Sequence, residues 1–433
     1  MYCKYNKMIK VFKFGGASVK DADSVRNVGN IIKNHAPKEL VVVVSAMGKT
    51  TNALEKVVYA WYNDTSALGK ALDEVIKFHQ HIISDLFGDN KHAIFAEINH
   101  IFNQLNKQLE TAPFENFNYA YDCIVSYGEM LSTAIMHAYL NATGFNCKLF
   151  DVRKLIRTDE AWREGNVDWE YTEKQINGEL MPFFKESSTH PAIALTQGFL
   201  GGTKNGHTTT LGREGSDYTA AIFSYVLNAT EMIVWKDVPG VLNADPKFFD
   251  KTILLQHISY REAIELTYYG ATVIHPKTIK PLQNKEIPLR VRSFVNPDEN
   301  GTLISQSSED DNLCASIILK SNQVLISFSP KDFSFIAENN LKEIFTALAD
   351  LHVRVNMMQT SAISFSICVD NDVTKINRLF ALLEEHFTYK YNEDLKLITI
   401  RNYTQQVIND VLKTYTLLVE QRSRQTAQYV VKS

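Results

Sequence analysis

Residues 8–16, MIKVFKFGG, form an apolar segment that ends at two consecutive glycines. After them, Val25, Val28 and Ile32 recur at i, i+3 and i+7, the spacing of one face of a helix. Residues 40–44, LVVVV, then form a short run without polar side chains, which is typical of a strand buried on both faces of a parallel sheet. The stretch therefore predicts a strand, a helix and a second, fully buried strand.

The same order of strand and helix recurs farther along the chain. Strands are predicted at residues 192–197 and 231–237, with a helix that begins near Ser216 between them. Repeated units of this kind imply a mostly parallel sheet covered by helices on both faces. The predicted fold class is therefore α/β, a three-layer α/β/α sandwich, with a helical insertion at about residues 60–120, where no clear strand pattern occurs.

The pattern changes after a stretch rich in turn formers and acidic residues, 296–311. Beyond it, Ile363, Phe365, Ile367 and Val369 alternate as in a half-buried strand, and a β-α-β-β order is repeated, which predicts two small α+β modules. The predicted divisions are a first domain over 8–298, a linker over 299–314, and a second region over 315–433 with modules at about 318–390 and 393–433.

Composition limits the classes of function. The 433 residues carry 45 Lys and Arg against 49 Asp and Glu, so the basic footprint of a nucleic-acid-binding protein is missing. The longest aliphatic run, 40–44, is far shorter than the roughly 18 residues of a membrane span. Five cysteines without a CxxC pair support neither a zinc site nor a disulfide framework, and no apolar signal region follows the first ten residues. We expect a cytoplasmic protein without nucleic-acid or membrane partners and without a resident metal.

Glycine marks four predicted junctions between a strand and a helix. Glycine lets a backbone approach a phosphate closely, and a helix N-terminus adds free N–H groups. A tight turn explains any one such junction, but four in one domain favour phosphate binding. The P-loop is excluded because Val43 stands where its first glycine would fall, and no GxGxxG follows a strand. The junctions are Gly15-Gly16, Gly48, 198–202 and 212–217.

Charged residues cluster at the same junctions. Lys13 lies near the end of an apolar strand, where an ammonium is costly without an anionic partner. Asp217 enters a helix N-terminus, where capping alone would explain it. Arg213 could bind a carboxylate or simply lie on the surface. Glu129 follows Gly128 in an apolar helix, and Asp237 precedes a turn. Each has an ordinary structural explanation, and only their joint clustering at strand ends indicates a site.

Seven motifs occur in order along the chain. They are KFGGASV at 13–19, VSAMGKTTN at 44–52, SYGE at 126–129, TQGF at 196–199, TTTLGREGSDYTA at 208–220, KDVPGVLNADP at 236–246 and YGATVIHP at 269–276. Together they closely resemble aspartate kinase, of the amino acid kinase superfamily, from about residue 8 onward. The second region resembles the paired ACT-type, ferredoxin-like regulatory modules of that family.

The resemblance implies an activity and its partners. Such enzymes transfer the γ-phosphoryl group of ATP, with Mg²⁺, to the β-carboxylate of L-aspartate, giving 4-phospho-L-aspartate. This is the first step of lysine, threonine and methionine biosynthesis, and it is feedback-regulated through the ACT-type modules. The resemblance further implies a homodimer or higher homo-oligomer, and a chain without a fused homoserine dehydrogenase, since no sequence remains for one.

The resemblance also implies residue roles. Lys13 would stabilise phosphate charge during transfer, organised by Asp217, while Glu129 would contact the α-amino group of aspartate and Arg213 would hold its carboxylate. The remaining predicted substrate residues are Ser45, Thr51 and Ser216. Predicted nucleotide residues, besides Lys13, are Gly15, Gly16, Lys236, Asp237, Leu242, Lys247 and Thr272, and predicted effector residues are Ser334, Asn339, Asn340 and Asn356.

Some positions depart from the family pattern. Leu242, Thr272 and Lys247 stand where members often carry Tyr, Lys and Arg, all on the nucleotide side. Asn356 replaces an Asp common in lysine-sensitive members, so the inhibitory amino acid stays open. Two other functions remain: another amino acid kinase with a carboxylate acceptor, and a non-catalytic amino-acid sensor.

Overall fold

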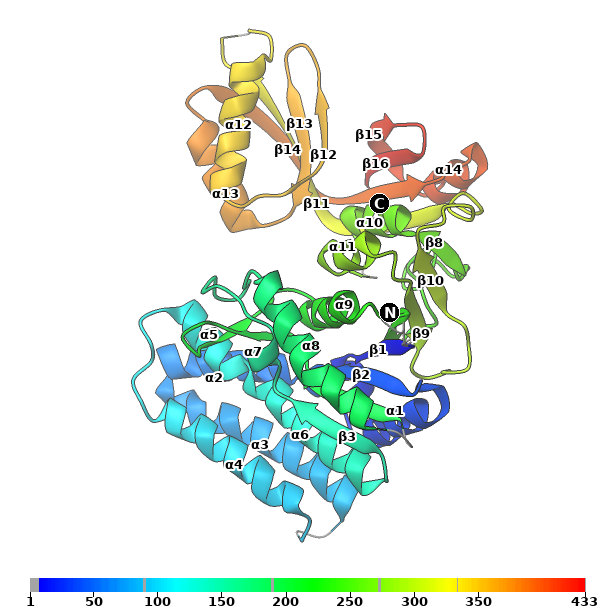
Figure 1. The fold of residues 1–433 in the computed structure, drawn as a ribbon. Helices are drawn as coiled ribbons and strands as arrows, with labels where there is room; N and C mark the ends of the chain where they lie inside the picture. Colours follow the sequence, from blue (N-terminus) through cyan, green and yellow to red (C-terminus); the bar gives the residue numbers. More distant parts are fainter. Residues whose placement is uncertain (1–7, 89–90, 188–190, 272–273, 333, 433) are drawn as a thin grey trace. The chain divides into compact units, whose positions relative to one another are not determined.

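A computed structural model describes residues 8–432 except 89–90, 188–190, 272–273 and 333. The chain divides into two compact units, which we describe separately (Figure 1). The first comprises residues up to 241 together with 256–260 and 274–308, and the second comprises 242–255, 261–273 and the chain from 309 onward.

The first unit is built on an eight-stranded sheet in the order β3-β4-β2-β1-β7-β9-β10-β8. Neighbouring strands are parallel except β9 and β10, so the predicted mostly parallel sheet is confirmed. The strands are β1 (Ile9–Phe14), β2 (Glu39–Val44), β3 (Asn146–Phe150), β4 (Ala192–Gln197), β7 (Glu231–Lys236), β8 (His257–Ser259), β9 (Leu289–Ser293) and β10 (Thr302–Ser305). A separate antiparallel pair joins β5 (Leu200–Gly202) to β6 (Thr208–Thr210).

Helices cover both faces of this sheet. Those of the first unit are η1 (Gly16–Val19), α1 (Ala22–His35), α2 (Thr50–Asn63), α3 (Thr65–Phe87), α4 (Ala93–Leu109), α5 (Phe117–Val125), α6 (Tyr127–Ala142), α7 (Val152–Leu155), α8 (Trp169–Glu186), α9 (Gly215–Leu227) and α11 (Pro276–Asn284). Helix α10 (Tyr260–Tyr269) starts in the first unit and continues into the second. Helices α3, α4 and α6 lie side by side (Figure 1), and the described part of the predicted helical insertion at 60–120 contains helices and no strand.

The register of β1 sets the position of Lys13. Side chains alternate along a strand, so Phe12 and Phe14 enter the apolar core that includes residues of α1 and α6. Lys13 points to the opposite face, where α9 packs against β1. Its strand neighbours are Val43 on β2 and Val234 on β7, so the aliphatic part of the Lys13 side chain lies among apolar side chains of the central strands.

The second unit contains a six-stranded sheet, β12-β13-β11-β14-β16-β15, with antiparallel neighbours. Two strands of 15 residues run through its centre, β11 (Ser316–Pro330) and β14 (Phe387–Arg401). The others are β12 (Val355–Thr360), β13 (Phe365–Asp370), β15 (Thr416–Arg422) and β16 (Thr426–Lys432). The helices are α12 (Glu338–Asp350), α13 (Val373–Leu383) and α14 (Gln405–Leu412), and α12 and α13 share one apolar core with the sheet (Figure 1).

The observed sheet divides this region differently from the predicted module boundaries. Residues 316–320 of β11 pair with the end of β14, next to β16, whereas residues 325–330 pair with its beginning, next to β13. The first part of β11, the end of β14, β15 and β16 therefore form one group of strands, and the chain between them forms the other group. The first group combines segments on both sides of the second in the sequence, so a single boundary at 390–393 does not separate the two. The predicted linker at 299–314 contains β10, which belongs to the eight-stranded sheet.

Among the residues that the structure describes, no helix has both the length and the apolar character that crossing a membrane requires.

A buried ion pair in the second unit provides a test of the fold. Arg401 Nη2 on β14 lies 2.5 Å from Glu262 Oε2 on α10, and the two side chains are only 7% and 5% exposed. Removing Glu262 leaves Arg401 buried with only the longer contact to Glu265, Nη1 to Oε2 at 3.6 Å. We predict that Glu262→Gln lowers the free energy of unfolding of this unit by up to about 3–5 kcal/mol, measured by chemical denaturation. The control is Asp23→Asn, which breaks the exposed pair with Arg26 and should cost under about 1 kcal/mol. Equal, small losses in both variants would contradict the prediction.

Candidate active site

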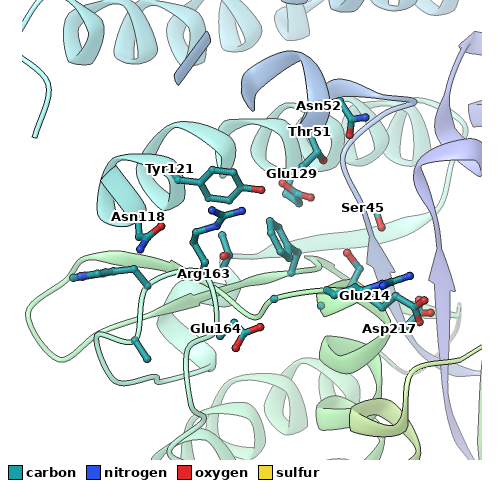
Figure 2. Close-up of a pocket in the computed structure, with 18 of the residues that line it drawn as sticks. Ser45, Thr51, Asn52, Asn118, Tyr121, Glu129, Arg163, Glu164, Glu214 and Asp217 are labelled. Carbon is teal, nitrogen blue, oxygen red and sulfur yellow. The ribbon is translucent and has the colours of Figure 1, made fainter. Parts of the chain in front are cut away.

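One cavity of about 1040 Å³ opens in the first unit (Figure 2). The predicted catalytic residues, Lys13 and Asp217, both line it. So do all five predicted substrate residues: Ser45, Thr51, Glu129, Arg213 and Ser216. They come from the carboxyl ends of β1 and β2, from the first turns of α2, α6 and α9 and, for Arg213, from the loop before α9, where ligands collect in open α/β sheets.

The centre of this cavity is an ion pair. Lys13 Nζ lies 2.6 Å from Asp217 Oδ1, and the side chains are 11% and 3% exposed. Lys236 Nζ, at the end of β7, lies 3.8 Å from the second oxygen of Asp217. Burial alone would raise the pKa of Asp217, but Lys13 and Lys236 together hold it below its usual value. The site therefore presents an ionised carboxylate between two lysines at the carboxyl ends of the central strands.

Close backbone packing puts the pieces of the site together. A Cβ added at Gly16 would lie 2.6 Å from the carbonyl oxygen of Gly48, so only glycine lets these two loops meet. A Cβ added at Gly198 would lie 2.5 Å from that of Ser216, so the end of β4 packs directly against the start of α9. The glycines of the sequence motifs thus bring the strand ends and the helix N-terminus together.

The start of α9 adds polar groups to the cavity. Glu214 has a left-handed backbone with φ of 54° and precedes the first helical residue. Its carboxylate Oε2 accepts a hydrogen bond from the His275 N–H at 2.9 Å. Ser216 and Asp217 follow in the first helical turn, where N–H groups and the helix dipole favour an anion.

Glu129 is a second deeply buried acid of the cavity. It lies in the first turn of α6, is 2% exposed, and accepts the Ala46 N–H through Oε1 at 3.2 Å. Its Oε2 has no hydrogen-bond partner among the described residues. Burial raises the pKa of Glu129 to about 8. A cation that enters the cavity would favour the ionised form of this carboxyl group.

Twelve residues that line the cavity were not among the predicted site residues. Five polar ones come from α2, from α5 and from the irregular segment before α8 (Figure 2): Asn52, Asn118, Tyr121, Arg163 and Glu164. No motif used for the prediction covers α5 or the segment around Arg163, and Asn52, the last residue of its motif, was given no role. The available signal was an arginine beside Trp162 in a segment with many charges.

Several predicted nucleotide residues do not line the cavity. Gly15, Gly16 and Asp237 belong to the first unit but are not part of its lining. Leu242 and Lys247 belong to the second unit, where Leu242 forms a β-bridge with Leu254 and the N–H of Lys247 is bonded to the Asp245 carboxylate. Thr272 lies outside the described residues. Lys236 is the only one of the seven, Lys13 aside, that the described structure places at the cavity.

The predicted effector residues do not gather in one place of the second unit. Asn340 accepts the Ala337 N–H at the start of α12, and Asn339 lines a cavity between α12 and α13. Asn356 lies on β12, where it accepts a hydrogen bond from Lys320 Nζ at 2.8 Å. Ser334 is exposed before α12.

Comparison with known proteins adds a family to this geometry. Residues 8–293 match the Amino acid kinase family, which is more than half of the chain, so the chain belongs to that family. Aspartokinase 1, chloroplastic, of Arabidopsis thaliana is 33% identical over 374 residues, which is 83% of this chain and 63% of the relative. The chain thus spans less than two thirds of that relative.

Other relatives are covered more fully. Lysine-sensitive aspartokinase 3 of Escherichia coli is 31% identical over 362 residues, 84% of this chain and 78% of the relative. A crystal structure of E. coli aspartokinase III with lysine and aspartate is similar, with a TM-score of 0.82, 27% identity and coverage of 98% and 96% of the two chains. The R-state structure of that protein with aspartate and ADP gives a TM-score of 0.79, 26% identity and the same coverage. Within the amino acid kinase family, the chain belongs to the aspartokinases.

The buried state of Glu129 makes stability depend on pH. In the native protein Glu129 keeps its proton up to a pKa of about 8, whereas an unfolded chain loses it near 4.5. Between these two pKa values the unfolded state therefore binds fewer protons than the native state. The contribution of Glu129 to the free energy of unfolding is complete below pH 4.5 and decreases as the pH rises to about 8. We predict that wild type loses up to about 1.4 kcal/mol per pH unit relative to Glu129→Gln in this window.

Chemical denaturation of both proteins without ligand between pH 5 and 9 measures this difference. Glu97→Gln, on an exposed part of α4, controls for the loss of a carboxylate. A difference between wild type and Glu129→Gln that does not change with pH would contradict the buried, protonated carboxyl.

Proposed function

We propose that the protein is an aspartate kinase, which transfers the γ-phosphoryl group of ATP to the β-carboxylate of L-aspartate and gives 4-phospho-L-aspartate. The observation that carries the proposal is the cavity in which the Lys13–Asp217 pair faces the buried, half-satisfied carboxyl of Glu129. An anion can bind at one end of this cavity and an amino group at the other. The E. coli relative binds aspartate and ADP in its R-state structure, which supports the same pair of ligands here.

The residues divide the work in a simple way. The β-carboxylate of aspartate is ionised at neutral pH, so the acceptor needs no general base. Phosphoryl transfer needs positioning and charge neutralisation, which Lys13 supplies at the phosphoryl oxygens while Asp217 holds its ammonium in place. Glu129 receives the α-ammonium, and Arg213 binds a carboxylate of the substrate. Ser45, Thr51 and Ser216 line the space between these charges.

ATP is proposed to enter as its Mg²⁺ complex. The metal supplies charge neutralisation at the phosphates when it is bound. The described residues contain no group of three or more His, Cys, Asp or Glu side chains that could hold a metal. Nucleotide phosphates would lie near Lys13 and Lys236, which both line the cavity. The nucleotide roles of Gly15, Gly16, Asp237, Leu242, Lys247 and Thr272 stay predictions from the sequence.

Regulation by an amino acid is the second part of the proposal. The E. coli relative is lysine-sensitive and was solved with lysine bound. The six-stranded sheet of this chain corresponds to the predicted ACT-type region, so we propose that it binds an amino-acid effector. The cytoplasmic location and the homo-oligomeric state stay predictions, as does the place of the reaction at the start of lysine, threonine and methionine biosynthesis.

An ATP-dependent hydroxamate assay tests the activity directly, because hydroxylamine traps an acyl phosphate. The assay uses L-aspartate, L-glutamate and N-acetyl-L-glutamate as acceptors, and is repeated with lysine, threonine or methionine added. Hydroxamate formed from aspartate alone supports the proposal. Product from another acceptor would indicate a different amino acid kinase, and no product from any acceptor would favour a sensor.

The role of Lys13 gives a kinetic prediction. Lys13→Met leaves Lys236 beside Asp217, so the protein should stay folded with a lower free energy of unfolding. Its kcat should fall by about 10²–10³, the size expected when one preorganised electrostatic stabiliser is lost. Lys10→Met is the matched control, since Lys10 lies on the same strand but pairs with Glu231 and does not line the cavity. Near-normal kcat in Lys13→Met, measured by steady-state kinetics, would remove Lys13 from the mechanism.

The role of Arg213 predicts a selective change in KM. Arg213→Ala should raise KM for aspartate at least about tenfold and KM for ATP far less, because a lost charge-assisted hydrogen bond affects the ligand that made it. Arg26→Ala, on α1, controls for the loss of an exposed arginine. A rise in KM for ATP instead would mean that Arg213 lies at the nucleotide end of the cavity and not at the aspartate end.

A further inference from the structure

Arg163 places a guanidinium group in the cavity that no motif of the sequence predicted. Its guanidinium carbon lies 4.1 Å from the centre of the Tyr121 ring, and Figure 2 shows the two side chains side by side at the end of the cavity where Glu129 lies. The Tyr121 hydroxyl donates a hydrogen bond to Glu55 Oε1 at 2.8 Å, which fixes the ring beneath the arginine. Among the described residues, no carboxylate forms an ion pair with Arg163.

The backbone at Arg163 is held in a conformation that is uncommon for a residue with a side chain. Its φ is 70°, in the left-handed region. Its N–H donates a hydrogen bond to Asp122 Oδ2 at 2.9 Å. Asp122 is fully buried and also accepts the N–H and the hydroxyl of Thr210, at 3.0 and 2.8 Å. One buried carboxylate therefore fixes the arginine backbone to β6, and conformations of this kind persist where the surroundings determine them.

This anchoring brings Arg163 close to the backbone of Arg213. The N–H of Gly165 donates to the Thr210 carbonyl at 2.9 Å. A Cβ added at Gly212 would lie 3.3 Å from the Arg163 carbonyl oxygen, so the two segments are in direct contact immediately before Arg213. The cavity thus receives two guanidinium groups from adjoining pieces of chain, and both side chains are exposed to it.

The charges that remain unpaired match one kind of ligand. Lys13, Lys236 and Asp217 satisfy one another, and Glu214 accepts the His275 N–H. Glu129 lacks a partner on one oxygen, and Arg163 lacks a carboxylate partner among the described residues. An α-amino acid carries an ammonium and a carboxylate on the same carbon, so it can satisfy Glu129 and Arg163 at once. Arg213 and Glu164 likewise form no ion pair with a described residue, and Glu164 packs against Gly212.

We infer that Arg163 binds the α-carboxylate of the substrate together with Arg213, and that it selects acceptors with a free α-carboxylate next to the amino group. The inference rests on the proposed function for the identity of the substrate. Asp122 and Tyr121 act as positioning residues, because they fix the backbone and the guanidinium plane of Arg163. Two arginine forks on one carboxylate give the bidentate geometry that lysine cannot reproduce.

The test pairs one side-chain change with one ligand change. L-Aspartate is compared with its α-amide, which keeps the amino group and the β-carboxylate but removes the α-carboxylate charge. Binding to wild type, Arg163→Met and Arg163→Lys is measured by calorimetry, and phosphoryl transfer is measured with the hydroxamate assay. We expect wild type to bind aspartate at least about tenfold more tightly than the α-amide. Arg163→Met should lose most of this ratio by weakening aspartate alone, and Arg163→Lys should restore it only in part.

Arg157→Met is the matched control. Arg157 lies in the same segment and its guanidinium carbon is 3.8 Å from the centre of the Tyr171 ring, but it does not line the cavity. This variant should keep the wild-type ratio. Arg163→Gly removes the side chain and suits the left-handed backbone, so it must repeat the result of Arg163→Met if that variant fails to fold.

The two possible failures are distinguishable. An Arg163→Met protein that keeps the full wild-type preference for aspartate over its α-amide would overturn the inference, and the hydroxamate assay would still report on the proposed function. Wild type that binds aspartate but transfers no phosphoryl group to it would overturn the proposed function, while the binding ratio would still test Arg163.

Discussion

The ion pair between Lys13 and Asp217 is the constraint on which the site depends. Two charged side chains that are only 11% and 3% exposed at the carboxyl end of a sheet are stable only if they remain within hydrogen-bond distance of each other. Lys13 comes from β1 and Asp217 from the first turn of α9, so the pair fixes the helix against the central strand. The same contact holds the lysine ammonium at the helix N-terminus, where an anion is favoured from two directions. Structure and chemistry therefore depend on one distance.

The rest of the cavity is arranged as a set of charges that a ligand completes. Glu129 is buried with one oxygen unsatisfied, and Arg163 and Arg213 enter from adjoining segments. Groups fixed in this way before the ligand arrives need little reorganisation when it binds, which is the main source of electrostatic catalysis. The costs are visible in the fold: a left-handed backbone at Arg163 and a buried carboxyl whose pKa is raised to about 8 at Glu129. An amino acid that binds between them would remove the second cost.

The sequence predicted the parts of this arrangement that lie in regular elements. Lys13, Glu129 and Asp217 each stand at the end of a strand or the start of a helix, and because parallel strands end at one edge of a sheet, these positions converge in space. Arg163 has no such context: its segment is irregular, and the contact with Asp122 that positions it joins residues 41 apart. The pairing of the long strands β11 and β14 was also not predictable, because an alternating pattern identifies a strand but not its neighbours. Only the second half of β11 pairs with β13, and only the second half of β14 pairs with β16.

A structure with L-aspartate and a non-hydrolysable ATP analogue tests the central claim most directly. The account predicts that Lys13 Nζ lies within hydrogen-bond distance of the γ-phosphate oxygens while it still contacts Asp217, and that the aspartate β-carboxylate faces the γ-phosphorus. A γ-phosphate bound more than about 10 Å from Lys13, with the Lys13–Asp217 pair unchanged, would contradict it, because at that distance the lysine ammonium could not donate a hydrogen bond to the transferred group.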